Sequence, residues 1–210
     1  MARDFSISTD TINYSGVPPI SGLSTVSIVA RCAGDSDTVS FGTILYCVNG
    51  ANNAGIAFGR NSTQQVMYFA IRNLNTNLRT FPFNFDGVYR SVVITFDGNA
   101  SPKDVVYVDG VSQTISGTTF QTTTIGTPTI HQISAPGGSR WNGRLAELGI
   151  YDRVITQGEA ESHSDGASCL RFRRGLIFYA PFIRDVTDFC RGLTGTITGT
   201  TVTAHPRIYA

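Results

Sequence analysis

The sequence has 210 residues, a formal net charge of +1 and only 15% charged residues. So small a net charge excludes a global field that would attract nucleic acid or an anionic membrane surface. A chain of this length can bury a sizeable core without disulfides, and its many Gly, Ser, Thr and Asn residues favour short strands joined by turns.

The N-terminal residues contain no apolar stretch typical of a secretory signal peptide, and no window reaches the ~18 apolar residues of a membrane span. We therefore expect a protein made in the cytoplasm, with no membrane partner and with free thiols. Should one disulfide form, Cys169–Cys190 is the best pairing. No C-x-x-C pair points to a zinc site.

Alternation of side chains with a period of two dominates most of the chain. In TVSIVARC (25–32), Val26 and Ile28 share one face of a predicted strand, and Ser27 and Arg31 lie on the other face. Roughly twelve stretches fit this strand template. We expect antiparallel sheets packed face to face.

A hairpin is predicted where SVVITF (91–96) and DVVYV (104–108) are followed by Asp109-Gly110. Asp-Gly suits the two positive-φ positions of a tight hairpin turn. FDGN (96–99) is a second turn signal of the same kind.

One short helix is predicted near 157–164. Thr156 followed by Glu159 is a capping box, in which each side chain bonds the backbone N–H of the other residue. Gly166 is the expected end of this helix.

The best candidate for a domain boundary is SDGAS (164–168). We expect one β-sandwich domain over 1–167 and a C-terminal extension over 168–210. Because so short an extension cannot build an independent core, we expect its strands to pack on the same domain or on a neighbouring subunit.

Two motifs resemble a known family. Residues 88–111 resemble the central hairpin of laminin-G-like, concanavalin-A-type jelly rolls, and residues 141–161 resemble the signature that follows it. This resemblance implies an all-β antiparallel sandwich but says little about function, because the fold hosts lectins, hydrolases, adhesion modules and virion proteins.

The C-terminal stretch 174–210 is similar to the C-termini of laminin-G-like proteins encoded in bacteriophage genomes. This similarity implies a virion structural protein, such as a decoration protein on the capsid head. Its partners would be capsid or other virion proteins, with a homo-oligomer as the default state.

A glycoside hydrolase is the remotest function considered. Enzymes of the laminarinase type carry E-x-D-x-E along one strand, and the residues here at that spacing are Glu147, Gly149 and Tyr151. Asp152 has the opposite parity, and Glu159 caps the helix. Because the pair of carboxylates needed for glycoside hydrolysis is missing, we expect no enzyme activity, with Glu147 on the outer, solvent-facing side of its strand.

No cofactor or resident metal is expected. Calcium remains open because its oxygen ligands can converge from distant loops, yet Asp86, Asp97, Asp104 and Asp109 are scattered and two of them precede glycine in turns.

A surface glycan is the alternative ligand. Arg140, Trp141 and Asn142 offer an aromatic with polar neighbours, although packing of Trp141 against the sheet is the competing interpretation. A carbohydrate-binding adhesion module that recognises host-surface glycans is therefore the alternative function.

Arg171, Arg173 and Arg174 form a basic cluster in CLRFRRG (169–175). Read as a strand, this stretch places Arg171 and Arg173 on one face. Arginine is favoured at interfaces, so these residues are the predicted subunit contact, whereas nucleic-acid binding would need more basic and aromatic residues. The leading hypothesis is thus a non-enzymatic virion structural protein.

Overall fold

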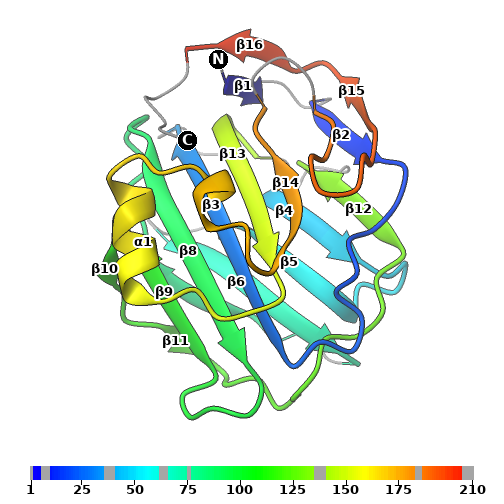
Figure 1. Ribbon diagram of the computed structural model, residues 1–210, viewed down its shortest axis with the longest axis vertical. Coiled ribbons are helices and arrows are strands. Elements are labelled where there is room, and N and C mark those ends of the chain that lie inside the picture. Colours follow the sequence, from blue (N-terminus) through cyan, green and yellow to red (C-terminus); the bar gives the residue numbers. More distant parts are fainter. Residues whose placement is uncertain are drawn as a thin grey trace.

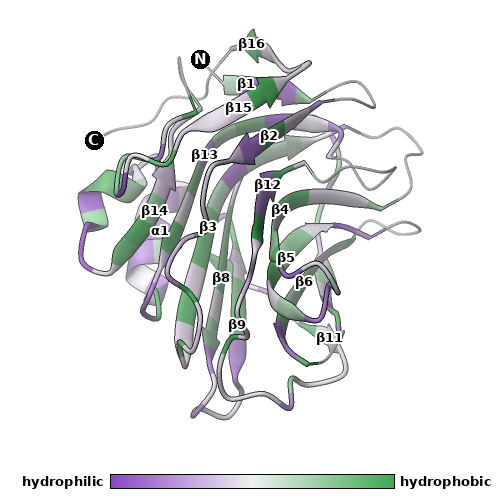
Figure 2. Ribbon diagram, turned by 90° about the vertical axis from the view of Figure 1, so that its right-hand side faces the viewer, coloured by the Kyte–Doolittle hydropathy of each residue, from purple (hydrophilic) through white to green (hydrophobic). Residues whose placement is uncertain are grey.

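The computed structural model describes residues 2–5, 10–35, 41–61, 66–74, 77–134, 141–182 and 186–204. These residues form two antiparallel eight-stranded sheets, which we name sheet A and sheet B (Figures 1 and 2). The strands of sheet A are β1 (Ala2–Phe5), β3 (Thr25–Gly34), β8 (Arg90–Asp97), β9 (Asp104–Val108), β10 (Val111–Ser112), β13 (Gly143–Tyr151), β14 (Leu176–Ala180) and β16 (Thr201–Thr203). The strands of sheet B are β2 (Thr11–Tyr14), β4 (Gly42–Val48), β5 (Ala54–Arg60), β6 (Val66–Asn73), β7 (Arg79–Pro82), β11 (Ser116–Gly117), β12 (Ile130–Ile133) and β15 (Gly195–Thr198).

This arrangement confirms the predicted all-β sandwich. Sheet A runs in the order β10-β9-β8-β3-β13-β1-β16, with β14 also paired to β13, and sheet B runs β11-β7-β6-β5-β4-β12-β2-β15. Two helices complete the described residues, α1 (Gln157–Ser164) and the 3₁₀ helix η1 (Cys169–Phe172). Neither is long and apolar enough to cross a bilayer, and the same holds for every helix in the described part of the chain.

The core lies between the two sheets. Val26 and Ile28 of β3 point into it, as the alternation predicts, and meet Phe58 and Phe69 from sheet B in the same apolar cluster. Both phenylalanines are fully buried, and burial of each such side chain contributes about 1.5–3 kcal/mol.

The hairpin predicted at Asp109-Gly110 joins β9 to β10. Both residues have positive φ, 50° and 75°, and the Asp109 carboxylate accepts the backbone N–H of Ser91 at 2.9 Å. Asp-Gly therefore suits this turn both by backbone conformation and by the hydrogen bond of its carboxylate.

The C-terminal residues add strands to both sheets of the same chain. β14 pairs with β13, β15 pairs with β2, and β16 pairs with β1. In Figure 1 the two last strands lie at the top of the molecule, beside the two first strands. The C-terminal part of the chain thus closes the edge of each sheet that its N-terminal part begins.

One predicted strand is wrong. CLRF (169–172) forms η1 instead, because the Ser168 hydroxyl accepts the N–H of Leu170 at 3.2 Å and so caps a helical turn. Gly175 then has a φ of 72°, which turns the chain into β14. Arg171 and Arg173 consequently do not share a strand face.

Candidate functional site

The outer face of sheet A is covered by α1 and η1. Figure 1 shows both helices in front of the sheet, α1 over β8 and β9 and η1 over β13 and β3. Val29 and Val93 of the sheet form a second apolar cluster with Ile155, Ala160 and Cys169 from the covering segment. This layer positions every group described below.

The helix α1 begins as predicted. Thr156 is the N-cap, its hydroxyl accepts the Glu159 N–H at 3.3 Å, and the Glu159 carboxylate accepts the Thr156 N–H at 2.9 Å. The predicted capping box and the bounds of the helix are confirmed.

A cleft of about 560 Å³ opens between the start of α1 and the end of η1. We call it the arginine cleft, because four of its seven lining residues are arginines. It is lined by Arg153, Thr156, Glu159, Arg171, Phe172, Arg173 and Arg174. Its volume lies within the range of about 300–1,000 Å³ that is typical of small-molecule sites.

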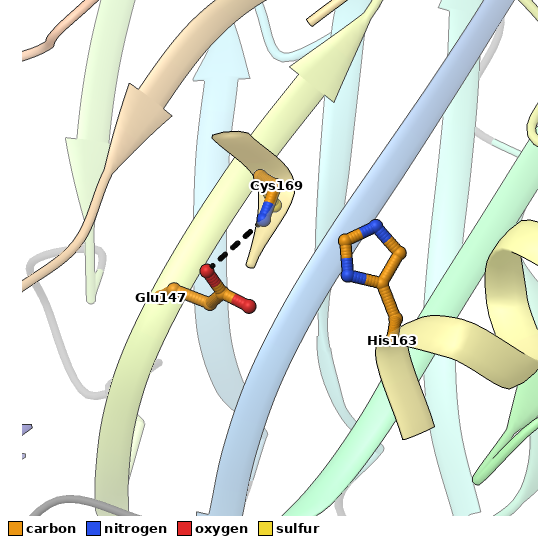
Figure 3. Close-up of side chains that lie close together, drawn as sticks. All are labelled: Glu147, His163 and Cys169. Atoms are coloured by element: carbon orange, nitrogen blue, oxygen red, sulfur yellow. Dashed lines mark hydrogen bonds between the residues drawn. The ribbon is translucent and has the colours of Figure 1, made fainter. Parts of the chain in front are cut away.

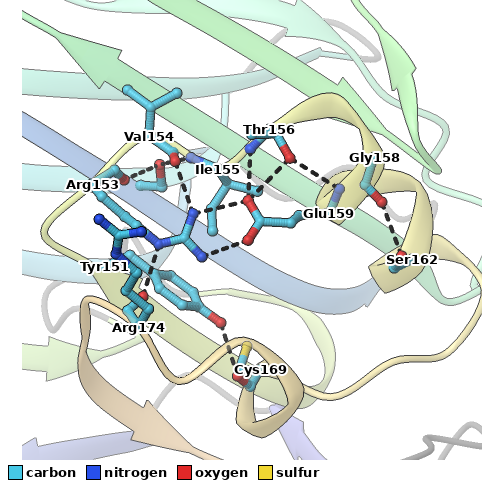
Figure 4. Close-up of polar contacts among 11 residues, drawn as sticks. Tyr151, Arg153, Val154, Ile155, Thr156, Gly158, Glu159, Ser162, Cys169 and Arg174 are labelled. Atoms are coloured by element: carbon cyan, nitrogen blue, oxygen red, sulfur yellow. Dashed lines mark hydrogen bonds and ion pairs between the residues drawn. The ribbon is translucent and has the colours of Figure 1, made fainter.

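Arg153 and Glu159 form the fixed wall of the cleft (Figure 4). Two Arg153 nitrogens meet the two carboxylate oxygens of Glu159 at 2.9 and 2.6 Å, a bidentate ion pair. Hydrogen bonds from Arg153 lower the pKa of Glu159 to about 2, and this pairing raises the pKa of Arg153. The guanidinium also donates to the backbone oxygens of Arg174 at 2.8 Å and Val154 at 3.0 Å.

The opposite wall is held close by Gly175. A Cβ at this position would lie 2.5 Å from Asp152 Oδ1 and 3.0 Å from Arg153 Cγ. The Gly175 carbonyl accepts the Asp152 N–H at 2.8 Å, which ties the turn before β14 to the loop after β13. Glycine therefore permits the approach that brings the arginines of residues 171–174 beside Arg153.

The predicted basic cluster lines this cleft. Arg171, Arg173 and Arg174 are all exposed, and the half-buried Phe172 ring lies among them. Their side chains carry no ion pair within the described ranges. Sequence reasoning found these three residues, but it missed Arg153, Thr156 and Glu159 as their neighbours.

The other predicted contact site is not an exposed aromatic platform. Trp141 is only 1% exposed, and its ring packs 6.3 Å from that of Phe85 within the core. This is a correction to the glycan-contact role considered for Trp141, since a buried indole has no free face for a sugar. Asn142 is half-buried, with its carbonyl accepting the Asp35 N–H at 3.3 Å, and Arg140 lies outside the described residues.

Glu147 is also placed differently from the prediction. Its side chain does point outward from the core, but it is only 1% exposed because α1 and η1 cover it. It accepts hydrogen bonds from Tyr179 Oη at 3.2 Å and the Cys169 N–H at 3.4 Å, and Arg31 Nε lies 3.9 Å from its other oxygen. Burial raises the pKa of this carboxyl, which the Arg31 charge opposes.

Glu147, His163 and Cys169 converge in this buried layer (Figure 3). One ligand atom of each lies within 4.8 Å of the others, although sequence spacing gave no sign of this group. His163 Nδ1 lies 2.8 Å from the Ala167 carbonyl, and burial lowers the pKa of this imidazole to about 4. The imidazole is therefore neutral at pH 7.

This buried group fits a core network better than a metal or catalytic centre. A zinc ion would have to sit about 2.0–2.3 Å from all three ligand atoms, directly beside the Arg31 guanidinium that already balances Glu147. Burial also raises the pKa of the Cys169 thiol well above its ordinary value, which opposes the thiolate needed by a nucleophile. All three side chains are at most 1% exposed, so no substrate reaches them.

The aspartates considered as calcium ligands have other partners. Asp104 pairs with Arg79 at 2.9 Å, and Asp86 and Asp109 both pair with Arg90. Asp97 accepts the N–H of a turn residue at 2.9 Å.

Comparisons with known proteins identify the fold. A family model described as the concanavalin A-like lectin/glucanases superfamily matches residues 10–161, which agrees with the predicted resemblance. No curated protein matches the chain.

Among solved structures, a candidate carbohydrate binding protein from Bacteroides ovatus superposes with a TM-score of 0.73 and 15% identity over 99% of this chain. The match covers 61% of that protein, so this chain spans less than two thirds of its length. A SAP-like pentraxin from Limulus polyphemus has a TM-score of 0.67 and 14% identity, with 97% of this chain and 94% of that one covered.

The CBM40 module of the Ruminococcus gnavus IT-sialidase, solved with α2,3-sialyllactose, also matches. Its TM-score is 0.55 and its identity 12%, with 77% of this chain and 97% of that one covered. At these identities the likeness shows a shared fold.

Proposed function

The chain belongs to the concanavalin A-like lectin/glucanases superfamily, and we propose that it is a non-catalytic glycan-binding module that holds its ligand in the arginine cleft. The cleft carries this proposal, because it joins a binding volume of about 560 Å³ to an accessible set of polar side chains and one aromatic ring. A ligand site needs such a volume together with polar groups that fix the orientation of the ligand.

The side chains of the cleft suit a sugar. The guanidinium groups offer hydrogen bonds to ring hydroxyls, and the Phe172 ring offers an apolar surface for the C–H groups of a pyranose. Fold neighbours described as carbohydrate-binding, from Bacteroides ovatus and Ruminococcus gnavus, support the same class of ligand.

Catalysis is not supported by the carboxylates of the cleft. Glu159 is the single carboxylate among its lining residues, and glycoside hydrolysis requires two. The ion pair with Arg153 holds the pKa of Glu159 near 2, so it cannot act as the general acid at neutral pH. The proposal is therefore binding without turnover.

The virion assignment stays a prediction. The matched structures named above are a candidate carbohydrate binding protein, a carbohydrate-binding module and a pentraxin, which support glycan binding rather than capsid decoration. If the chain instead decorates a particle, the arginine cleft would contact a partner subunit and the isolated chain would bind no glycan.

A glycan array probed with the purified chain tests the proposal. We expect binding to a defined set of glycans, and its loss in an Arg171→Ala/Arg174→Ala double variant. Arg191→Ala is the matched control, because Arg191 is exposed and lies outside the cleft. Incubating each bound glycan with the chain should release no product, and an array without specific signal would overturn the proposal.

A further inference from the structure

We infer that the ligand of the arginine cleft is an acidic saccharide, bearing a carboxylate or a sulfate. This inference rests on the proposed glycan-binding function and names its ligand class. Four arginines and one glutamate line the cleft, an excess of three positive charges. The whole chain carries a net charge of only +1, so the cleft concentrates positive charge that the rest of the molecule offsets.

Among the described residues, one of the four arginines of the cleft is held in an ion pair. Arg153 is held by Glu159 in a bidentate pair at 2.6 and 2.9 Å. Arg173 donates from Nε to the Leu170 carbonyl at 3.3 Å, a weak bond to a neutral acceptor. Arg171 and Arg174 have no side-chain partner in the described part of the structure, so their guanidinium groups are free to bind an anion.

The neighbouring arginine charges repel one another, and a bound anion would remove this repulsion. Three like charges within a stretch of four residues repel one another, and solvent screens this repulsion only in part. A carboxylate or sulfate placed among them would accept charge-assisted hydrogen bonds, which the forked guanidinium donates in pairs. The N-terminus of α1 does not compete for this anion, because the capping box already occupies it.

The remaining residues favour a saccharide as the carrier of the charge. Phe172 lies half-buried between Arg171 and Arg173, with its ring fixed edge-on against His163 at 5.4 Å. A sugar ring can cover this apolar face while its acidic group meets the arginines. The volume of about 560 Å³ suits a short oligosaccharide better than an extended polymer.

Calorimetric titration of the full chain tests the inference. The probes are sialyllactose, which carries a carboxylate, sulfated lactose, neutral lactose and a single-stranded oligonucleotide. We expect at least one acidic saccharide to bind tenfold or more tightly than lactose, and to weaken as salt is raised. Arg171→Ala and Arg174→Ala should each weaken that binding about tenfold, the effect of losing one charge-assisted contact, whereas Arg191→Ala should not.

The possible outcomes separate the two proposals. Equal affinity for lactose and the acidic saccharides overturns the acidic class and leaves the glycan-binding function standing. If no saccharide binds, the glycan-binding function fails as well, and binding of the oligonucleotide alone would reassign the cleft to nucleic acid. The relative affinity for sialyllactose and sulfated lactose identifies the acidic group. Thermal unfolding of each alanine variant, and of Arg171→Gln, shows whether weaker binding comes from a lost contact or from a destabilised fold.

Discussion

Replacing Glu159 with Gln tests whether the ion pair at the wall of the arginine cleft stabilises the layer over sheet A. The carboxylate lies 2.6 and 2.9 Å from two nitrogens of Arg153, and this pairing lowers its pKa from 4.5 to about 2. A pKa lowered to that extent corresponds to about 3 kcal/mol at full strength. Because the side chain is 20% exposed, solvent screening reduces the expected contribution to about 1–2 kcal/mol.

Glutamine keeps the capping box, so Glu159→Gln removes the charge while leaving the helix start intact. We expect urea unfolding at pH 7, followed by fluorescence of the single buried Trp141, to show a loss of about 1–2 kcal/mol. Glu161→Gln is the control, since Glu161 is exposed on the same helix and forms no ion pair with a described residue. Its effect should stay within about 0.5 kcal/mol.

The pH dependence of the free energy of unfolding shows whether the ion pair causes the stability difference. A carboxyl whose folded pKa is lowered stabilises the fold fully above its unfolded pKa of 4.5, and this stabilisation is lost as pH falls toward 2. The difference between the wild type and Glu159→Gln should therefore be constant above pH 5 and shrink below it. A difference that is absent at pH 7, or that persists unchanged at pH 2, would refute the ion-pair account.

The burial of individual side chains can be tested by substitution and by chemical labelling. Glu147→Ala leaves the Arg31 guanidinium buried without its carboxylate. Urea unfolding should therefore show a free energy of unfolding lowered by about 3–5 kcal/mol. A decrease below about 1 kcal/mol would contradict the buried network. In the native chain an aromatic disulfide reagent should modify Cys190 before the other three thiols, because Cys190 is exposed and the others are buried. The reaction should be slow, since partial burial raises the pKa of the Cys190 thiol to about 11 and so lowers its thiolate fraction. All four thiols should react in urea, and modification of more than one thiol before unfolding would contradict the packing. Trp141→Phe should leave glycan binding unchanged while lowering stability by about 1–3 kcal/mol, whereas a specific loss of binding would restore the platform role.

The alternation of apolar and polar residues was enough to predict the sandwich, because a strand with one face on the core places an apolar side chain there at every second residue. The 25–32 strand illustrates both the power and the limit of this signal. Val26 and Ile28 point into the core as predicted, yet Ser27 and Arg31 on the other face are buried too. The period of two tells on which face of the sheet a side chain lies, but it does not tell whether another layer covers that face.

Glu147 shows the same limit within the candidate site. The face of the strand on which Glu147 lies was predicted correctly. Its predicted exposure was wrong, because α1 and η1 fold back over the outer face of sheet A. The helix α1 was predicted from its capping box, but η1 comes from a segment whose short apolar run is equally typical of a strand. The Ser168 cap, a local hydrogen-bond signal, was the feature that distinguished η1 from a strand.

The arginine cleft could be predicted in part. Arg171, Arg173 and Arg174 are adjacent in sequence, so their cluster was visible, but Arg153 and Glu159 join them only through the close approach at Gly175. Contacts of this kind between two loops depend on the tertiary path of the chain and leave no periodic signal in the sequence.

A crystal structure of the chain soaked with sialyllactose would show directly where an acidic saccharide binds. We expect the sugar in the arginine cleft, with its carboxylate about 3 Å from guanidinium nitrogens of Arg171, Arg173 or Arg174 and its ring against Phe172. Sialyllactose bound elsewhere, with the cleft empty, would contradict this expectation.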